Sequence, residues 1–123
     1  MKKILPILLL ILATNVAMAQ DNEALKKHYL KIYDQGLAYN DVSASINALH
    51  GYLAIDNSLN YKDTLSMLYF SVKNYYSALL LGEEVYKAQP ENVSAMARSA
   101  ECYDELGDPK TAVTLYEQVV PKT

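Results

Sequence analysis

The sequence predicts an all-α protein built from about three antiparallel helical hairpins. From residue 21 onward, apolar residues recur at intervals of three and four rather than two, as they do on one face of a helix. Short polar breaks separate the helical segments, which favours antiparallel neighbours. A constant shift of 34 residues also places Tyr69 on Tyr103, Ala78 on Ala112 and Val85 on Val119, a period typical of repeat proteins.

The first twenty residues have the three-part order of a secretory signal peptide. Lys2 and Lys3 precede an apolar run from Ile4 to Ala13, and the small-residue sequence Ala17-Met18-Ala19 follows. We expect cleavage after Ala19 and export to the periplasm or out of the cell. The alternative is an uncleaved membrane anchor, but a span needs about 20 apolar residues and this run stops after about ten. We therefore expect no stable membrane span after cleavage.

Charge and length limit the classes of function. The chain has 123 residues, with 11 basic and 14 acidic side chains. Removal of residues 1–19 takes away two lysines and leaves nine basic residues, for a net charge of about −5. This balance argues against nucleic acid as a partner, because phosphate neutralisation needs a basic face. Residues 20–123 are long enough for one small domain.

Cys102 is the only cysteine, so no intrachain disulfide can form. A free cysteine buries readily, and we expect it to be a small core residue of a helix. An intermolecular disulfide or a reactive thiol is the alternative. Because no intrachain disulfide can form, side-chain packing must hold the fold together.

The breaks carry the chemistry of helix ends. They fall at residues 36–40, 56–60, 73–74, 89–92, 107–109 and 121, leaving six segments of roughly 11 to 16 residues. Asp41, Asn74 and Asp108 are suited to accept hydrogen bonds from the first free amides of the following helices. Pro109 fits the first helical position, and Gly107 fits a left-handed residue that closes a helix.

Residues 59–120 resemble the tetratricopeptide repeat (TPR) family, whose 34-residue unit is a helical hairpin with small residues at positions 8, 20 and 27. Counting from Leu59, the matches are Leu65 at 7, Ser66 at 8, Tyr69 at 11, Tyr75 at 17, Ala78 at 20 and Pro90 at 32. Counting from Val93, they are Met96 at 4, Ala100 at 8, Tyr103 at 11, Ala112 at 20 and Tyr116 at 24. Lys62, Gly82, Ser99 and Pro109 depart from the pattern.

A poorer copy precedes these two. Counting from Glu23 puts Tyr33 at position 11, Val42 at 20 and Ile46 at 24. The apolar spacing defines the start of this unit only to within about two residues. The resemblance implies a right-handed α-solenoid with repeats at about 23–58, 59–92 and 93–123. It also places four tyrosines inward, namely Tyr33, Tyr69, Tyr103 and Tyr116.

Catalytic motifs are missing from the sequence. Asp104 and Glu105 are adjacent on a helix, so their carboxylates do not face each other. Residues 103–120, which contain them, also lack the D-x-D-x-D-G pattern of a calcium-binding loop. Neither His28 nor His50 has a nucleophile or carboxylate at a sequence spacing typical of an acid–base site, and we expect both histidines at the surface. No phosphate loop, zinc spacing or nucleophile elbow occurs. We therefore expect no enzyme activity, cofactor or metal.

The resemblance implies that the first helix of each repeat lines a concave surface that binds a peptide or a partner protein. Positions 2, 5, 9, 12 and 13 of the family fall on Lys27, Lys31, Gln35, Asp63, Met67, Phe70, Ala97, Glu101, Asp104 and Glu105. The charge along this surface would run from basic through apolar to acidic. We expect Met67 and Phe70 at its hydrophobic centre; the alternative is that both pack between neighbouring hairpins.

These observations predict a non-enzymatic scaffold or adaptor in the cell envelope that binds a protein or peptide partner. Two alternatives stay open. The chain is a structural subunit that self-associates through its C-terminal end, where Val113, Val119 and Val120 would be partly bare. Or it is the N-terminal part of a longer repeat protein.

Overall fold

Six α-helices follow one another in the chain. The computed structural model describes the backbone of residues 5–122 and the side chains of residues 18–122. The described part contains no strand. Its elements are α1 (Leu5–Ala38), α2 (Val42–Ile55), α3 (Leu59–Ser71), α4 (Tyr75–Ala88), α5 (Val93–Glu105), α6 (Pro109–Val119) and a short 3-10 turn, Val120–Lys122.

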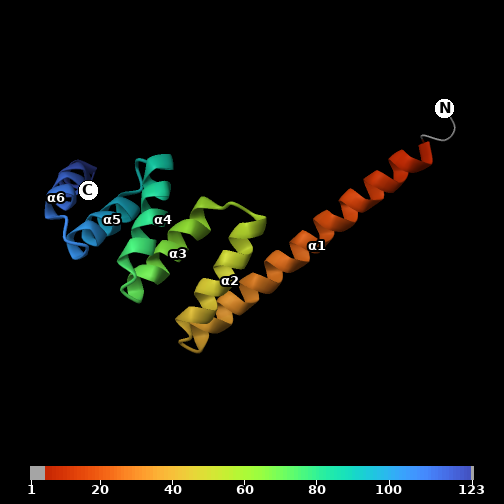
Figure 1. The fold of residues 1–123 in the computed structure, drawn as a ribbon, viewed down its shortest axis with the longest axis horizontal. Helices are drawn as coiled ribbons and strands as arrows, with labels where there is room; N and C mark the ends of the chain where they lie inside the picture. Colours follow the sequence, from red (N-terminus) through yellow and green to blue (C-terminus); the bar gives the residue numbers. More distant parts are fainter. Residues whose placement is uncertain (1–4, 123) are drawn as a thin grey trace.

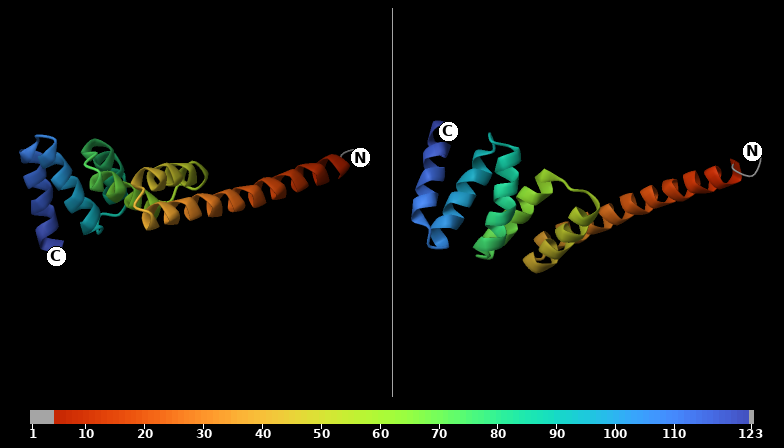
Figure 2. Two further views of the ribbon diagram at one scale, coloured as in Figure 1. Left: turned by 90° about the horizontal axis from the view of Figure 1, so that it is seen from below. Right: turned by 45° about the horizontal axis from the view of Figure 1, so that its top comes forward.

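The helices form three hairpins that stack in a row, so the predicted all-α solenoid is confirmed. Helices α1 and α2, α3 and α4, and α5 and α6 pack as antiparallel pairs, and α4 packs broadly against α5 (Figures 1 and 2). The contact between α2 and α3 is less extensive. Each hairpin buries its apolar stripe against its neighbours, which is how a repeat protein builds a core without a central layer.

The same turn chemistry closes all three hairpins. A residue with left-handed backbone ends the first helix, and φ is 58° at Asn40, 63° at Lys73 and 89° at Gly107. The next residue caps the second helix, and its carboxylate or amide oxygen accepts a hydrogen bond from the backbone N–H three residues later. These caps are Asp41, Asn74 and Asp108, at 3.1, 3.3 and 3.2 Å. The predicted caps and the left-handed Gly107 are therefore confirmed.

The caps also set the register of the first hairpin. Asp41 lies 33 residues before Asn74, and Asn74 lies 34 before Asp108. Counted from its cap, the first unit begins at Lys26, three residues later than the start that the apolar spacing suggested. Ser45 then takes the place of Ala78 and Ala112 at the tight helix crossing. Turn chemistry decides the register because the apolar stripe of α1 fits more than one frame.

Small residues at the crossings of the first two hairpins are tied by hydrogen bonds. The Ser45 hydroxyl donates to the Tyr33 carbonyl oxygen at 2.8 Å in the first hairpin. The Ser66 hydroxyl donates to the Ala78 carbonyl oxygen at 2.7 Å in the second. Both serines are fully buried, so these bonds satisfy polar groups that would otherwise destabilise the core.

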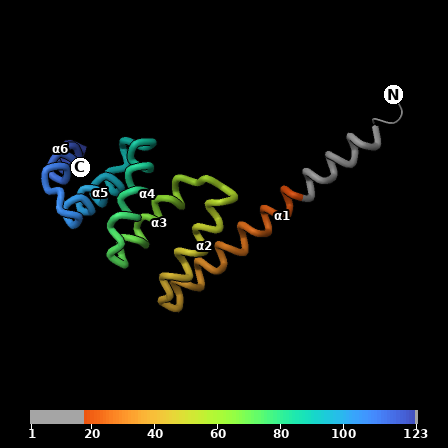
Figure 3. The backbone as a smooth tube through the Cα atoms, in the orientation of Figure 1, coloured from red at the N-terminus to blue at the C-terminus, as the bar shows by residue number. Residues whose placement is uncertain are grey.

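Helix α1 is longer than predicted. It has 34 residues, and the expected cleavage position after Ala19 lies within it. Lys2 and Lys3 lie outside the described residues, so the signal peptide stays a prediction. Residues 18–25 are all exposed, and this part of α1 extends beyond α2 (Figure 3). Among the described residues, no helix is long and apolar enough to cross a membrane.

The core lies both within and between hairpins. One cluster joins the first two hairpins (Ile46, Leu49 and Leu65), another joins the last two (Ala78, Leu79 and Cys102), and a third lies inside the last (Met96, Ala100, Leu115 and Val119). Burying one such leucine stabilises the fold by about 1.5–3 kcal/mol. Cys102 is fully buried, as predicted.

Two expectations about α6 are wrong. Tyr116 is 40% exposed and does not point into its hairpin, and Leu115 fills that place instead. The reason is geometric, because one residue along a helix turns a side chain by about 100°. Val119 is buried rather than bare, since it packs with Leu115 and Met96.

The departures from the family pattern have structural reasons. The Lys62 ammonium, at a position usually filled by a large apolar residue, forms an ion pair with Glu84, so the second hairpin holds a charge where a hydrophobe was expected. Gly82 lies against Ser99 of the next hairpin, where an added Cβ would come within 2.5 Å of the Ser99 Oγ. Two small residues at one joint allow α4 and α5 to approach closely.

Candidate functional site

The predicted partner-binding residues lie on α1, α3 and α5, the first helices of the three hairpins. Lys27 and Lys31 are exposed on α1, and Glu101, Asp104 and Glu105 are exposed on α5. Between them, Met67 on α3 is 48% exposed, whereas Phe70 and Asp63 are half-buried. Within the described side chains, no hydrogen bond or ion pair joins the two lysines to the residues of α3 or α5.

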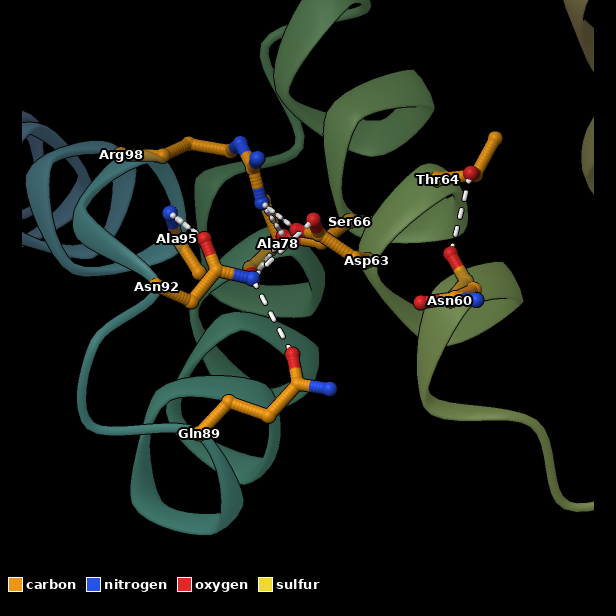
Figure 4. Close-up of polar contacts among 9 residues, drawn as sticks. All are labelled: Asn60, Asp63, Thr64, Ser66, Ala78, Gln89, Asn92, Ala95 and Arg98. Atoms are coloured by element: carbon orange, nitrogen blue, oxygen red, sulfur yellow. Dashed lines mark hydrogen bonds and ion pairs between the residues drawn. The ribbon is translucent and has the colours of Figure 1, made fainter.

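Asp63 is held by an internal ion pair that joins α3 to α5 (Figure 4). The Arg98 Nη1 donates to Asp63 Oδ1 at 2.8 Å and to Ser66 Oγ at 3.1 Å. The Asn92 amide donates to the other Asp63 oxygen at 3.5 Å, while its own oxygen caps α5 through the Ala95 N–H. The carboxylate therefore fixes the third hairpin on the second, and it faces solvent only in part.

Phe70 is joined to the acidic side chains of α5 through Tyr75. The Phe70 and Tyr75 rings meet edge to face with centroids 5.6 Å apart. Burial raises the pKa of the Tyr75 hydroxyl, and the nearby Glu105 and Glu101 carboxylates raise it further. The structure therefore brings Phe70, Glu101 and Glu105 to one surface, with Tyr75 between them.

Tyr116 borders the other side of the acidic side chains. Burial raises the pKa of its hydroxyl, and the Glu101 and Asp104 carboxylates add to that effect. Sequence reasoning missed Tyr75 and Tyr116 as surface residues. The signal for Tyr75 was its place directly after the Asn74 cap, because the first turn of α4 packs beside the end of α5.

Cys102, Tyr103 and His50 carry side chains of the kinds used in catalysis, and each has a defined environment in the fold. Burial raises the pKa of the Cys102 thiol to about 11, so it stays protonated at neutral pH and is a poor nucleophile. Tyr103 donates a short hydrogen bond to Glu83, which raises the pKa of Tyr103 far above its usual range. The exposed His50 Nε2 lies 2.6 Å from the Tyr69 hydroxyl. Within residues 18–122, no cluster of three or more His, Cys, Asp or Glu side chains could hold a metal ion.

The structure changes the alignment of the basic end of this surface. With the first unit beginning at Lys26, Lys27 takes position 2 and Lys31 takes position 6, which is the position of Arg98 in the third hairpin. In the described structure, Lys27 and Lys31 lie exposed on α1, Met67 and Phe70 lie on α3, and Glu101, Asp104 and Glu105 lie exposed on α5.

Comparison with known proteins identifies the fold but not a family. No protein-family model matches the chain, and no curated protein matches its sequence. Two crystal structures of MamA match with a TM-score of 0.69 and 18% identity, over 79% of this chain and 54% and 57% of theirs. The second TPR of Spaghetti (RPAP3), bound to the HSP90 peptide SRMEEVD, matches with a TM-score of 0.70 and 17% identity, over 86% of this chain and 99% of that one.

The chain thus spans about half the length of the MamA structures that it matches. At these identities the likeness shows a TPR-like fold and nothing more specific, because one fold serves many functions. The residues of the site must carry the functional argument.

Proposed function

We propose that this chain is a non-enzymatic scaffold or adaptor that binds a peptide or a segment of a partner protein on the surface formed by α1, α3 and α5. The observation that carries the proposal is the half-exposed Met67, three residues before Phe70 on α3, together with the contact of the Phe70 ring with Tyr75 near the carboxylates of α5. An exposed methionine next to aromatic rings and fixed charges is typical of an interface centre. The structural likeness to a TPR that is bound to a peptide supports the same reading.

The charges define the chemistry of the partner. An apolar side chain would contact Met67 and Phe70, and a lysine or arginine of the partner would face Glu101 and Glu105. A cation in that place would also lie beside the Tyr75 ring. At the other end, the exposed Lys27 would favour an acidic residue. Such charges set the orientation and the rate of association more than the affinity.

We place this function in the cell envelope. The support is the predicted signal peptide of residues 1–19, whose apolar run is too short for a span and is followed by small residues. Mass spectrometry of the chain made in its producing cells tests this directly. A mature form that begins at Gln20 is the expected result, whereas an intact N-terminus would remove the envelope from the proposal.

Binding is tested with synthetic peptides of about 12 residues and with a pull-down from the envelope fraction. One peptide alternates leucine and lysine, a second replaces lysine by glutamate, and a third replaces it by serine. We expect the lysine peptide to bind best on this surface, and we expect Glu101→Gln with Glu105→Gln to remove that preference. Equal binding of all three peptides would contradict the assigned chemistry.

Variants at the centre separate contact from packing. Met67→Glu changes an exposed side chain and should leave the fold intact, and Phe70→Ala removes the half-buried ring. Each should weaken binding about tenfold or more if these residues lie at the interface centre. Tyr76→Ala is the matched control, because Tyr76 is 64% exposed on α4 and belongs to no part of the site. Unchanged affinity of a folded Met67→Glu chain would show that the partner binds elsewhere.

A further inference from the structure

Helix α6 presents a face that is buried at the equivalent place in α4. Val113 is 54% exposed and Tyr116 is 40% exposed. The residues 34 positions earlier, Leu79 and Gly82, are buried under α5, with Leu79 in the cluster between the two hairpins and Gly82 against Ser99. The exposed face of α6 therefore repeats a surface that, inside the molecule, receives the first helix of the next hairpin.

The first hairpin carries the opposite half of this joint. A hollow of about 210 Å³ lies where the end of α1 meets the start of α2, lined by Ile32, Gln35, Gly36, Tyr39, Asp41 and Ala44. The hairpin-to-hairpin shifts of 33 and 34 residues place Ile32, Gln35 and Gly36 on Ser99, Cys102 and Tyr103. Those three residues of α5 all contact α4: Ser99 lies against Gly82, Cys102 shares a core cluster with Leu79, and Tyr103 donates a hydrogen bond to Glu83. The α1 side of the hollow is thus the counterpart of the part of α5 that α4 covers.

The two open faces carry large and small side chains in the reverse order from the internal joint between α4 and α5. At the internal joint, α5 supplies the large Tyr103 and α4 supplies Gly82. At the open faces, α1 supplies Gly36 in the place of Tyr103, and α6 supplies Tyr116 in the place of Gly82. Gly36 is small because Asp41 and Ser45 crowd it from within its own hairpin. The hollow of the first hairpin, which no large side chain at position 36 fills, therefore matches the exposed Tyr116 ring on α6, as close packing at an interface requires.

Charge favours the same pairing. Lys31, beside the hollow, takes the position of Arg98, whose guanidinium reaches back from α5 to Asp63 on the preceding first helix. In a second copy, Lys31 would reach toward α5 of the first copy, where Glu101 is exposed beside Tyr116. Opposite charges thus flank the apolar contact.

We propose that the chain associates head to tail with a second copy of itself, with Tyr116 of one copy seated in the hollow lined by Ile32, Gln35, Gly36, Tyr39, Asp41 and Ala44 of the next. The two faces differ, so the contact is heterologous and extends into a chain or closes as a ring. This inference goes beyond the proposed partner binding and centres on Tyr116 and the hollow of the first hairpin rather than on Met67 and Phe70. It would join the surfaces of α1, α3 and α5 of successive copies into one longer surface.

The test is analytical ultracentrifugation of the full chain, expressed from residue 1, over a wide range of concentration. The wild-type chain should form species larger than a dimer as its concentration rises. Tyr116→Lys removes the ring, and Ala44→Arg fills the hollow. Each change alone should weaken association at least roughly tenfold, as expected for a buried aromatic anchor. Circular dichroism confirms that both variants are folded, and Tyr76→Lys on α4 is the matched control.

Mixing the two variants is the decisive step. The Ala44→Arg chain keeps its ring and the Tyr116→Lys chain keeps its hollow, so one joint can form and the mixture should give a 1:1 dimer that grows no further. A wild-type chain that stays monomeric at all concentrations overturns the proposal. So does association that persists in both variants, or a mixture that remains monomeric. Self-association of Ala44→Arg as strong as that of the wild-type chain would also overturn it, because it would show an α6-to-α6 contact.

Discussion

A methyl group added at Gly36 should loosen the first hairpin. The Cβ of Gly36→Ala would overlap the Ser45 hydroxyl and lie 2.8 Å from the Asp41 carbonyl oxygen and 2.9 Å from the Ser45 N. Two of these neighbours are backbone atoms of the turn that Gly36 itself holds, because its carbonyl accepts from the Asp41 N–H at 2.7 Å. The turn and the start of α2 must therefore move away from α1.

The size of the effect follows from two opposing terms. Overpacking a close contact costs about 1–3 kcal/mol, and the backbone contacts favour the upper end of that range. Alanine in place of glycine within a helix returns about 1 kcal/mol. The net loss should be about 2 kcal/mol, which lowers the melting temperature of a domain of this size by about 8–16 °C.

Thermal denaturation followed by circular dichroism measures the loss, and amide hydrogen exchange locates it. Amides of α1 and α2 should lose protection first, while those of α5 and α6 change little, because a stack of hairpins is coupled only between neighbours. Removing the serine side chain as well, in Gly36→Ala with Ser45→Gly, should rescue the fold only in part, since the Asp41 oxygen remains. An unchanged or raised melting temperature for Gly36→Ala would refute the reasoning.

Three further predictions concern the joint between the second and third hairpins. Gly82→Ala should destabilise the fold by about 1 kcal/mol. In a Ser99→Ala background the same change should stabilise it, since the Ser99 hydroxyl supplies the clash and has no partner in the described structure. Urea denaturation of the wild type, both single variants and the double variant measures the coupling between the two positions, and purely additive effects would contradict it. Arg98→Met should cost roughly 2 kcal/mol by leaving the Asp63 carboxylate half-buried and unpaired, and adding Asp63→Leu should recover most of the loss in the same assay. Cys102 should resist iodoacetamide at pH 8 until the chain unfolds, and rapid labelling of the folded chain would disprove its burial. Because folding raises the pKa of the thiol from 9.0 to about 11, the unfolded chain loses this proton first, so the stability of the fold should fall as the pH rises from 9 to 11.

Local sequence chemistry carried much of the fold. Asp41, Asn74 and Asp108 act on amides three residues away, so their roles as caps could be predicted from the sequence alone. The 34-residue period likewise placed Ala78 and Ala112 at buried crossings. The first hairpin was harder, because its apolar stripe fits two frames and only the turn at Asn40 separates them.

The candidate site was predictable only in outline. Periodicity placed Met67 and the carboxylates of α5 on first helices, where they are exposed. It could not show that Asp63 is taken up by Arg98, 35 residues further on, or that Tyr75 bridges Phe70 and the carboxylates. Such contacts depend on how one hairpin rotates against the next, which no local spacing records.

The sequence by itself determined six helices, the capped turns between them and the burial of Cys102, since each depends on residues within one or two helical turns. Tertiary structure decided which side of α6 is covered, turning Leu115 inward and Tyr116 outward. It also left a hollow at Gly36 and paired Gly82 with Ser99. The physical reason is that side-chain size at a joint sets the distance between two hairpins, and that distance exists only once both are in place.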